Sequence, residues 1–286
     1  MTRVLYARPI KESLHLNLKS TVQKLKSNGV IPWLRVALVG NDPASQIYTK
    51  NKKKFIEGLG GKCDIIHIEE DIAEQSFKAK IKSLSSEKGI HGFLIQLPLP
   101  KQLSHLDVGN LIPPSLDVDG LNSLNMGELL KGDMKGNFYC ACTPKGIVTL
   151  LDYYDIPISG KNICIIGRSL IVGKPLSALL TNRSGTVTLC HSKTENLQYH
   201  TSNADIIIVA IGSPKFLKTQ HLNPSKNQTI IDVGINKSKE GKLFGDVDFE
   251  NVKESVAAIT PVPGGVGPLT ILSLAQNLLQ AAEKTL

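Results

Sequence analysis

Short apolar runs alternate with helical patterns through the first half of the chain, and this alternation restricts the fold more than any other feature of the sequence. Three strand-like runs at residues 34–39, 62–68 and 90–97 are separated by helical patterns at residues 44–59 and 74–87. Strands that alternate with helices in this way are typical of βαβ units, in which the strands run parallel. We therefore expect an α/β fold with a parallel sheet here.

A second series of strand-like runs follows a polar, glycine-rich stretch at residues 122–137. These runs are short, apolar and in several cases rich in β-branched residues, as the strands of a buried parallel sheet are. They lie at residues 162–166, 186–189, 205–211, 228–233 and 256–259. With 286 residues and a hydrophobic content of 41%, the chain can fill two modest cores. We expect two α/β lobes, the second of them Rossmann-like.

The boundary between the lobes falls near Cys140, just before Thr143 and Pro144 open another amphipathic helical pattern. A final helical pattern at residues 268–282 carries a leucine and alanine stripe that no later segment could cover, so we expect it to pack back on the first lobe. The predicted domains are residues 1–140 plus 266–286 and residues 141–265.

Cysteine usage and hydropathy favour a cytoplasmic, reduced protein. The five cysteines are odd in number and form no pair with metal or redox spacing, and we find neither a secretory signal pattern nor a long apolar span. The loop at residues 117–120 lacks the rest of a calcium-binding pattern, and the histidines form no helical ligand pair. We expect no metal site and no membrane span.

The net charge of +8 is compatible with an anionic ligand, with nucleic acid or with an ordinary solvated surface. The lysines are dispersed, and seven phenylalanines, six tyrosines and one tryptophan offer few platforms for stacked bases. Nucleic acid is therefore not expected as a partner, whereas the other two interpretations stay open.

Lys52 lies where the helical pattern at residues 44–59 predicts an apolar side chain. The predicted buried face comprises Ser45, Tyr48, Lys52, Phe55, Ile56 and Leu59. A lysine on this face loses solvation of its ammonium, which favours the neutral amine. The alternative is a lysine whose methylenes cover apolar surface while its ammonium stays in water. The preceding strand and turn place Tyr48 and Lys52 near the carboxyl end of a parallel strand, where open α/β sheets bind ligands, and this favours a functional role.

Two polar positions follow strand-like segments of the first lobe. Gln96 interrupts an apolar strand just before a turn that Pro98 fixes, on the sheet edge where we expect Lys52. A buried amide can also be satisfied by loop backbone, and this alternative stays open. Asp117 and Asp119 belong to a loop whose carboxylates commonly bond their own backbone, so the pattern alone does not assign them to a ligand.

The segment at residues 163–175 has the layout of a dinucleotide site: a buried strand, a glycine-bearing turn and a helix start whose amides and dipole would face a phosphate. Gly167 and Gly173 are six residues apart, so the segment is not the common G-x-G-x-x-G pattern, and a tight surface turn is the alternative. The next strand ends in Cys190-His191-Ser192-Lys193 without the acidic residue typical of NAD sites. With Arg168 nearby, this favours NADP.

Taken together, these segments resemble the bifunctional methylenetetrahydrofolate dehydrogenase/cyclohydrolase family over nearly the whole chain. The joint order of the segments is far more specific than any one of them. They comprise residues 45–52, 96–100, 117–120, 143–146, 167–169, 171–175, 232–236, 245–248 and 260–268. Ala141 departs from the family pattern, which usually has proline there, and this puts only the linker between the lobes in question.

The resemblance implies that the first lobe binds tetrahydrofolate derivatives and the second binds NADP. Methylenetetrahydrofolate would be oxidised to methenyltetrahydrofolate, which water would then convert to formyltetrahydrofolate. The family's motif makes Lys52 the catalytic lysine, Gln96 its hydrogen-bond partner and Tyr48 the residue that flanks the folate. The other implied substrate contacts are Leu97, Asp119, which binds the pterin, Pro263 and Gly264.

The resemblance also assigns cofactor contacts in the second lobe. Arg168 and Ser192 would contact the ribose phosphate, and Ser169 and Gly173 the remainder of the dinucleotide. The full implied set is Gly167, Arg168, Ser169, Gly173, Lys174, Pro175, His191, Ser192, Gly212 and Ile235.

A cytoplasmic homodimer through the second lobe, with a place in purine biosynthesis, is also implied by the resemblance. A dehydrogenase without hydrolase activity is the nearest alternative, and Lys52 together with Gln96 argues against it. A nucleotide-binding regulator is the alternative from another class, because it would keep residues 167–175 but would need no Tyr48 and Lys52 pair.

Overall fold

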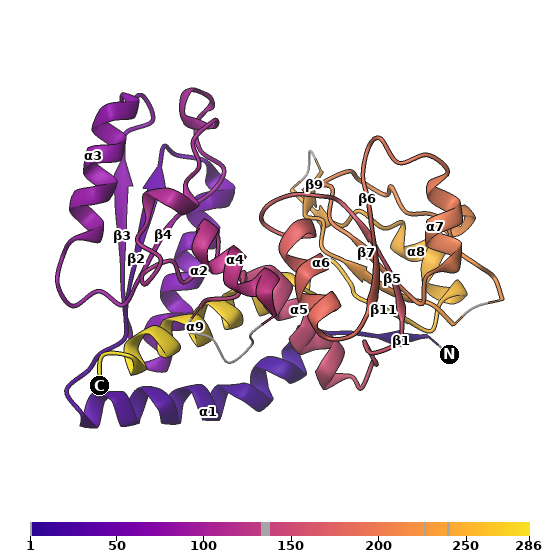
Figure 1. Ribbon diagram of the computed structural model, residues 1–286, viewed down its shortest axis with the longest axis horizontal. Coiled ribbons are helices and arrows are strands. Elements are labelled where there is room, and N and C mark those ends of the chain that lie inside the picture. The colour runs from indigo at the N-terminus through magenta and orange to yellow at the C-terminus, as the bar shows by residue number, and fades with distance from the viewer. Residues whose placement is uncertain (1, 133–137, 226, 239–240) are drawn as a thin grey trace. The chain divides into compact units, whose positions relative to one another are not determined.

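The computed structural model describes residues 2–132, 138–225, 227–238 and 241–286. The chain divides into two compact units, which we name after their sheets. The three-stranded unit comprises Leu14–Glu128, Asp133–Cys142 and Ser273–Leu286, and the six-stranded unit comprises Met1–Ser13, Leu129–Gly132 and Thr143–Leu272. Helices α1 (Ala7–Ser27), α4 (Ser123–Lys131) and α9 (Gly267–Glu283) contribute residues to both units (Figure 1).

The three-stranded unit has a fully parallel sheet in the order β3-β2-β4. Its strands are β2 (Trp33–Val39), β3 (Lys62–Ile68) and β4 (Gly92–Ile95), and its helices include α2 (Pro43–Leu59), α3 (Glu74–Ser85) and the short turns η1 (Lys101–Leu103) and η2 (Gly109–Leu111). The alternation of strands and helices predicted for this region is confirmed. Strand β4 is shorter than the predicted run at residues 90–97, and it ends ahead of a cis peptide bond between Leu97 and Pro98.

The C-terminal part of α9 packs on this unit, as predicted. The amide nitrogen of Asn277 donates to the backbone oxygens of Val118 at 2.9 Å and Cys140 at 2.8 Å. Asn277 is fully buried, and neighbouring leucines of the helix are buried with it. The leucine and alanine stripe of this helix therefore contributes to the core of the three-stranded unit.

The six-stranded unit has a fully parallel sheet in the order β1-β11-β8-β7-β5-β6. Its strands are β1 (Arg3–Val4), β5 (Asn162–Ile166), β6 (Thr186–Cys190), β7 (Ile206–Val209), β8 (Thr229–Asp232) and β11 (Ala258–Ile259). The order reverses at β5, since β6 lies on one side of it and β7 on the other. Ligands of open α/β sheets bind at such a reversal, outside the carboxyl ends of the strands.

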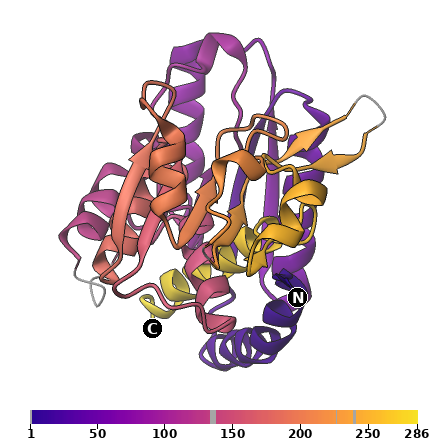
Figure 2. The same ribbon diagram turned by 90° about the vertical axis from the view of Figure 1, so that its right-hand side faces the viewer.

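Helices α6 and α7 cover opposite faces of this sheet (Figure 1). The helices of the unit are α5 (Cys142–Tyr153), α6 (Gly173–Asn182), α7 (Leu197–Asn203) and α8 (Phe249–Val252), with the turns η3 (Thr219–His221) and η4 (Lys253–Ser255). Strands β9 (Asn236–Lys237) and β10 (Leu243–Phe244) pair antiparallel and extend away from the main sheet (Figure 2). The predicted Rossmann-like sheet is confirmed.

Several elements were not predicted from the sequence, among them α4, α1, β1 and the strand pair β9 and β10. Residues 123–131 of the glycine-rich stretch form helix α4, whereas residues 133–137 lie outside the described part of the chain. Helix α1 was missed although its buried apolar residues recur at helical spacing, namely Ala7, Ile10, Leu18, Val22 and Leu25. Strand β1 has two residues and pairs with β11 from the far end of the chain, a partnership that only tertiary structure creates.

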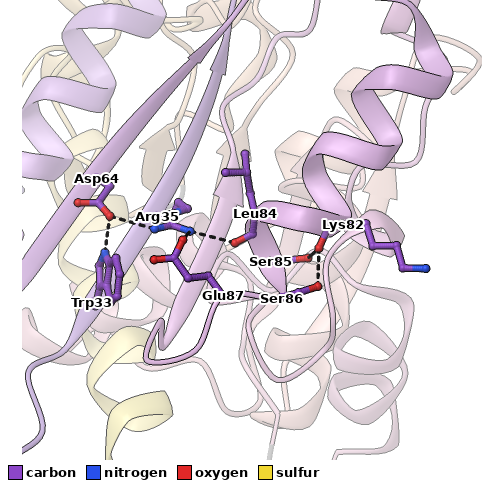
Figure 3. Close-up of polar contacts among 8 residues, drawn as sticks. All are labelled: Trp33, Arg35, Asp64, Lys82, Leu84, Ser85, Ser86 and Glu87. Carbon is purple, nitrogen blue, oxygen red and sulfur yellow. Dashed lines mark hydrogen bonds and ion pairs between the residues drawn. The ribbon is translucent and has the colours of Figure 1, made fainter.

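A buried arginine ties β2 to β3 and to the end of α3 (Figure 3). Arg35 is 4% exposed, and its guanidinium forms ion pairs with Asp64 at 3.3 Å and with Glu87. It also donates to the backbone oxygen of Leu84 at 3.1 Å, while the indole of Trp33 donates to Asp64 at 2.7 Å. Arg35 is the third residue of β2, so this network lies toward the amino ends of the strands, opposite the edge where a ligand is expected.

Candidate active site

Lys52 and Gln96 meet at the carboxyl edge of the three-stranded sheet. The Lys52 Nζ donates to the Gln96 Oε1 at 3.0 Å, and Lys52 is 7% exposed. The contact follows from the sheet, because helix α2 follows β2 and Gln96 follows β4, which pairs with β2. The backbone nitrogen of Gln96 donates to Ala37 at 2.8 Å, which continues that pairing. A lysine so placed does not hold its ammonium in bulk water.

The side-chain amide of Gln96 is fixed from both ends. Its Nε2 donates to the backbone oxygen of Leu97 at 2.6 Å, so its oxygen is the atom that faces Lys52. Leu97 is itself half-buried at the cis bond to Pro98. A neutral acceptor therefore holds one N–H of Lys52 in a fixed direction.

Helix α2 is fixed at both ends, and this sets the direction of Lys52. The Asp42 carboxylate accepts from the backbone nitrogen of Ser45 at 2.7 Å, and Pro43 occupies the first turn. The helix ends at Gly60, whose φ of 96° is the left-handed value that glycine adopts without strain. The buried residues are Ser45, Thr49, Lys52, Ile56 and Leu59.

Tyr48 lies at the margin of that buried face rather than at its centre. It is half-buried, as is Phe55, whereas Thr49 is buried and was not included in the predicted face. Partial burial raises the pKa of the Tyr48 phenol, so its hydroxyl stays protonated and can donate a hydrogen bond at neutral pH.

The two aspartates of the 117–120 loop have different surroundings. Asp117 is 1% exposed, and its Oδ2 accepts from the backbone nitrogen of Asn122 at 2.7 Å and from the Asn125 amide at 2.8 Å. Burial raises the pKa of Asp117 to about 6, against the opposing effect of these hydrogen bonds. Asp119 is half-buried, and no hydrogen bond engages its carboxylate within the described residues. The Asp117 carboxylate therefore bonds groups of the same chain segment, which was the alternative to a ligand-binding role. The Asp119 carboxylate is available to bind a ligand.

In the six-stranded unit, Gly167 and Gly173 face each other although six residues separate them. A Cβ on Gly173 would lie 1.8 Å from the Gly167 oxygen, and a Cβ on Gly167 would lie 2.3 Å from the Ala210 oxygen. Gly167 has a φ of 125°, which disfavours any other residue. Both glycines are therefore required for a tight loop between β5 and α6.

The loop between these glycines presents polar groups at the start of α6. The backbone nitrogen of Val172 donates to the Ser169 hydroxyl at 3.1 Å. The backbone nitrogen of Lys174 donates to the backbone oxygen of Ser169, also at 3.1 Å. The side chains of Arg168, Ser169 and Lys174 are exposed, while Pro175 is buried in the first turn of the helix. This is the geometry that a helix N-terminus offers to a phosphate.

The loop after β6 lies beside this turn. The Gly167 nitrogen donates to the Cys190 oxygen at 2.9 Å, and the Thr194 hydroxyl accepts from the His191 nitrogen at 2.8 Å. His191 is half-buried, whereas Ser192 and Lys193 are exposed. Because β5 and β6 are neighbours, Arg168 and Ser192 extend from adjacent strand ends. Hydroxyl and cationic groups at this position suit a ribose phosphate better than a free ribose hydroxyl.

The remaining predicted positions occupy loops after β7, β8 and β11. Gly212 and Ile235 are exposed, and Gly212 has a φ of 64°. Pro263 is exposed and follows a cis peptide bond, and the Gly264 oxygen accepts from the Ala7 nitrogen at 2.8 Å. All four lie at the carboxyl edge of the six-stranded sheet, as ligand-binding positions of such a sheet do.

Comparison with known proteins identifies the family. The family model described as tetrahydrofolate dehydrogenase/cyclohydrolase, catalytic domain, matches residues 5–119, and the model described as the NAD(P)-binding domain of the same family matches residues 141–286. The chain belongs to the tetrahydrofolate dehydrogenase/cyclohydrolase family. The resemblance stated from the sequence motifs is thereby confirmed.

Individual relatives match almost from end to end. The bifunctional protein FolD 1 of Lactobacillus johnsonii is 44% identical over 283 residues, which cover 99% of both chains. The crystal structure of the bifunctional FolD of Campylobacter jejuni is 40% identical, with a TM-score of 0.94 and full coverage of both chains. A Trypanosoma brucei FolD solved with NADP cofactor and inhibitor is 28% identical, with a TM-score of 0.91 and coverage of 99% and 98%.

As a member of this family, the chain is an enzyme with a dehydrogenase and a cyclohydrolase activity, and its second domain binds a nicotinamide dinucleotide. The tight glycine loop, the exposed Arg168 and Ser192 and the lack of an acidic residue at the end of β6 fit NADP. In the described part of the chain, no helix combines the length and apolar character that crossing a bilayer requires.

Proposed function

We propose that the chain oxidises methylenetetrahydrofolate with NADP and then hydrolyses the methenyl product to formyltetrahydrofolate. The observation that carries this proposal is the buried contact between Lys52 and Gln96. A dehydrogenase alone needs to orient its substrate, whereas hydrolysis needs a group that moves protons. The buried amine is such a group, and this favours a bifunctional enzyme over one that only oxidises.

In the hydrolytic step, Lys52 manages the protons as water attacks the methenyl carbon. In its neutral form, the amine accepts a proton from the attacking water. The Gln96 carbonyl accepts one N–H of Lys52 and so restricts the direction of the amine. Tyr48 flanks the folate from the same helix, and Leu97 borders the amide.

In the oxidative step, the protein supplies orientation and binding. NADP, when bound, supplies the acceptor for the hydride of the methylene carbon. The Gly167 to Gly173 loop admits the phosphates close to the backbone, and Arg168 with Ser192 binds the ribose phosphate. Ser169 contacts the remainder of the dinucleotide with Gly173. The other contacts in the loops after β5 and β6 are Lys174, Pro175 and His191, and Gly212 with Ile235 borders the nicotinamide side.

Asp119 binds the pterin in this proposal, since its carboxylate is not engaged by the described residues while that of Asp117 is. A pterin presents adjacent ring N–H and amino donors, which a carboxylate accepts as a pair. Pro263 and Gly264 contribute to substrate binding from the loop after β11.

The domain division, the assembly and the location also belong to the proposal. Residues 1–140 plus 266–286 bind the folate in this proposal, and residues 141–265 bind NADP. This division differs from the structural units at residues 1–13, 129–132 and 266–272, which belong to the six-stranded unit. Family resemblance favours a homodimer through the NADP-binding domain and a role in supplying one-carbon units for purine biosynthesis. A cytoplasmic location agrees with five cysteines that are all free thiols. Sedimentation equilibrium would measure the mass of the assembly.

Separate assays of the two partial reactions test the proposed function. With methylenetetrahydrofolate and NADP, we expect NADPH absorbance to rise. With methenyltetrahydrofolate alone, we expect its absorbance to decay faster than in buffer. Activity in the first assay only would identify a dehydrogenase without hydrolase activity, and saturable NADP binding without turnover would identify a regulator. Repeating the first assay with NAD measures the cofactor preference.

A further inference from the structure

Two buried carboxylates at the carboxyl edge of the six-stranded sheet have no part in the mechanism above. Asp232 is the last residue of β8, and Asp246 follows β10 by two residues. They are 2% and 0% exposed. Such groups are costly to bury unless hydrogen bonds satisfy them, so their partners indicate what they do.

Asp246 holds the loop that follows β7. Its Oδ2 accepts from the backbone nitrogens of Ile211 at 2.8 Å and Gly212 at 2.9 Å. Its Oδ1 accepts from the side-chain amide of Asn236 at 2.9 Å, and Asn236 directly follows Ile235. One carboxylate therefore determines the position of the backbone at two of the proposed cofactor contacts.

Asp232 holds Asp246 in turn. The Asp232 Oδ1 accepts from the backbone nitrogens of Asp246 at 2.9 Å and Gly234 at 3.2 Å, and its Oδ2 accepts from Val247 at 2.9 Å. Burial raises the pKa of Asp232 to about 7, and the nearby Asp246 adds to the increase while the backbone hydrogen bonds oppose it. The fold keeps the two carboxylates close together although this disfavours the charged form of Asp232.

Glycines make room for both carboxylates. A Cβ on Gly234 would lie 2.1 Å from the Asp246 carboxyl carbon, and a Cβ on Gly245 would lie 1.8 Å from the Asp232 Oδ2. The backbone at Gly234 therefore lies in contact with the Asp246 carboxylate, and the backbone at Gly245 with that of Asp232. A merely solvated surface pair would not require this close approach.

The strand order indicates which half of the cofactor these loops approach. The ends of β5 and β6 carry Arg168 and Ser192, which bind the adenosine ribose in the proposed function. A dinucleotide crosses the sheet at the reversal beside β5, so its nicotinamide half extends toward the ends of β7 and β8. Gly212 and Ile235 lie on those two ends.

We propose that Asp246 is a positioning residue for the nicotinamide half of NADP. It acts through the Ile211 and Gly212 amides and through Asn236, and it does not touch the cofactor, because it is fully buried. This inference rests on the proposed function, since it presupposes an NADP site at this sheet edge. Asp232 supports the arrangement by fixing the backbone of Asp246.

The test compares whole NADP with its adenosine half. We expect Asp246→Ala to weaken NADP binding roughly tenfold, because the backbone amides of Ile211 and Gly212 lose their acceptor, while binding of adenosine 2′,5′-bisphosphate stays unchanged. The KM for NADP should rise with little change in the rate of methenyl hydrolysis, which uses no cofactor. Calorimetric titration measures both affinities.

Two further variants keep the test decisive. Asp246→Asn retains one acceptor for the Ile211 and Gly212 amides, so its effect should be smaller, and adding Asn236→Asp should restore the contact that the amide loses. If Asp246→Ala does not fold, the affinities of the Asp246→Asn variant, with and without Asn236→Asp, test the proposal instead. Asp248→Ala is the matched control, because Asp248 lies two residues away and pairs with Lys215 at 3.7 Å.

The outcomes separate this inference from the proposed function. Wild-type protein that neither binds NADP nor reduces it would overturn the proposed function. Active wild-type protein whose folded Asp246 variants lose NADP and adenosine 2′,5′-bisphosphate equally, or lose neither, would overturn the positioning role alone.

Discussion

Two buried cations of the three-stranded unit differ in the groups that they contact, and the difference indicates what each one does. Arg35 contacts the carboxylates of Asp64 and Glu87, which hold its charge in place. Lys52 contacts the neutral amide oxygen of Gln96. A carboxylate would stabilise the ammonium form of a lysine, whereas an amide does so much less. Arg35 is therefore held in an ion-pair network, whereas Lys52 contacts a neutral group and is the residue to which we assign the proton transfer.

Arg168 should determine the preference for NADP. Replacing it in Arg168→Gln removes a cation from the end of β5, and we expect the KM for NADP to rise about tenfold or more while the KM for NAD changes little. Steady-state kinetics with each cofactor measures this. Arg183→Gln is the control, because Arg183 is an exposed arginine of the same unit that pairs with Asp152 at 2.7 Å. Equal losses for NADP and NAD would refute the assignment.

Asp117 should make the stability of the three-stranded unit depend on pH. Its pKa is about 6 in the folded protein against an ordinary 3.8, so the folded state binds its proton more tightly than the unfolded state. The contribution of this group to the free energy of unfolding therefore falls as the pH rises from about 4 to about 6, by at most about 3 kcal/mol.

The Asp117→Asn variant isolates this contribution. The Asp117 Oδ2 accepts both hydrogen bonds, and its Oδ1 is buried without a partner among the described residues, so an amide can keep both bonds without titrating. Urea unfolding at several pH values should show a smaller decrease between pH 4 and 6 for the variant than for wild type. Identical slopes would show that Asp117 does not titrate in this range.

At the scale of elements, the loop between β5 and α6 depends on backbone contact that only glycine allows. In Gly173→Ala, the added methyl group would lie 1.8 Å from the Gly167 oxygen, so the loop must open. We expect the KM for NADP to rise about tenfold or more, with methenyl hydrolysis retained.

Gly58→Ala is a suitable comparison for this loop variant. Gly58 lies within α2, and a Cβ there has no neighbour within 4 Å. This change should raise the free energy of unfolding by about 1 kcal/mol and leave NADP binding unchanged. A Gly173→Ala variant with a normal KM would show that the loop does not approach the cofactor.

The Arg35 network should stabilise its unit without taking part in catalysis. Arg35→Met leaves Asp64 and Glu87 without their cation, although both carboxylates stay partly exposed to water (Figure 3). We expect the free energy of unfolding to fall by about 2 kcal/mol and the hydrolysis rate per folded molecule to stay unchanged. Denaturant unfolding and a methenyl hydrolysis assay measure the two effects, and a folded variant that lost hydrolysis would contradict this division of roles.

Elements with apolar runs and clear boundaries could be predicted from the sequence. Strands β3 and β5 have the predicted bounds. Helix α2 begins one residue before its predicted start, and its bounds could be predicted because Pro43 and Gly60 mark its ends. Strand β1 could not be predicted, since it depends on pairing with residues more than 250 positions away. Local sequence patterns indicate individual helices and strands, but they do not show which distant strands pair.

At the scale of the whole molecule, the topology places Lys52 beside Gln96. Strand ends predicted that the two share a sheet edge, and the family resemblance implied the contact itself. The direction of the Gln96 amide could not be predicted, because it depends on the Leu97 backbone oxygen. The different surroundings of Asp117 and Asp119 depend on Asn122 and Asn125 in the same way. Family motifs marked the segments of Asp232 and Asp246 but assigned these two residues no role, because their partners are backbone amides of separate loops.

The rate of methenyltetrahydrofolate hydrolysis by Lys52→Met tests the central claim most directly. Methionine fills the buried position of Lys52 without an amine, so we expect a folded protein that binds NADP normally and hydrolyses the methenyl substrate about a hundredfold or more slowly than wild type. A folded Lys52→Met enzyme that hydrolyses this substrate at the wild-type rate would contradict the account.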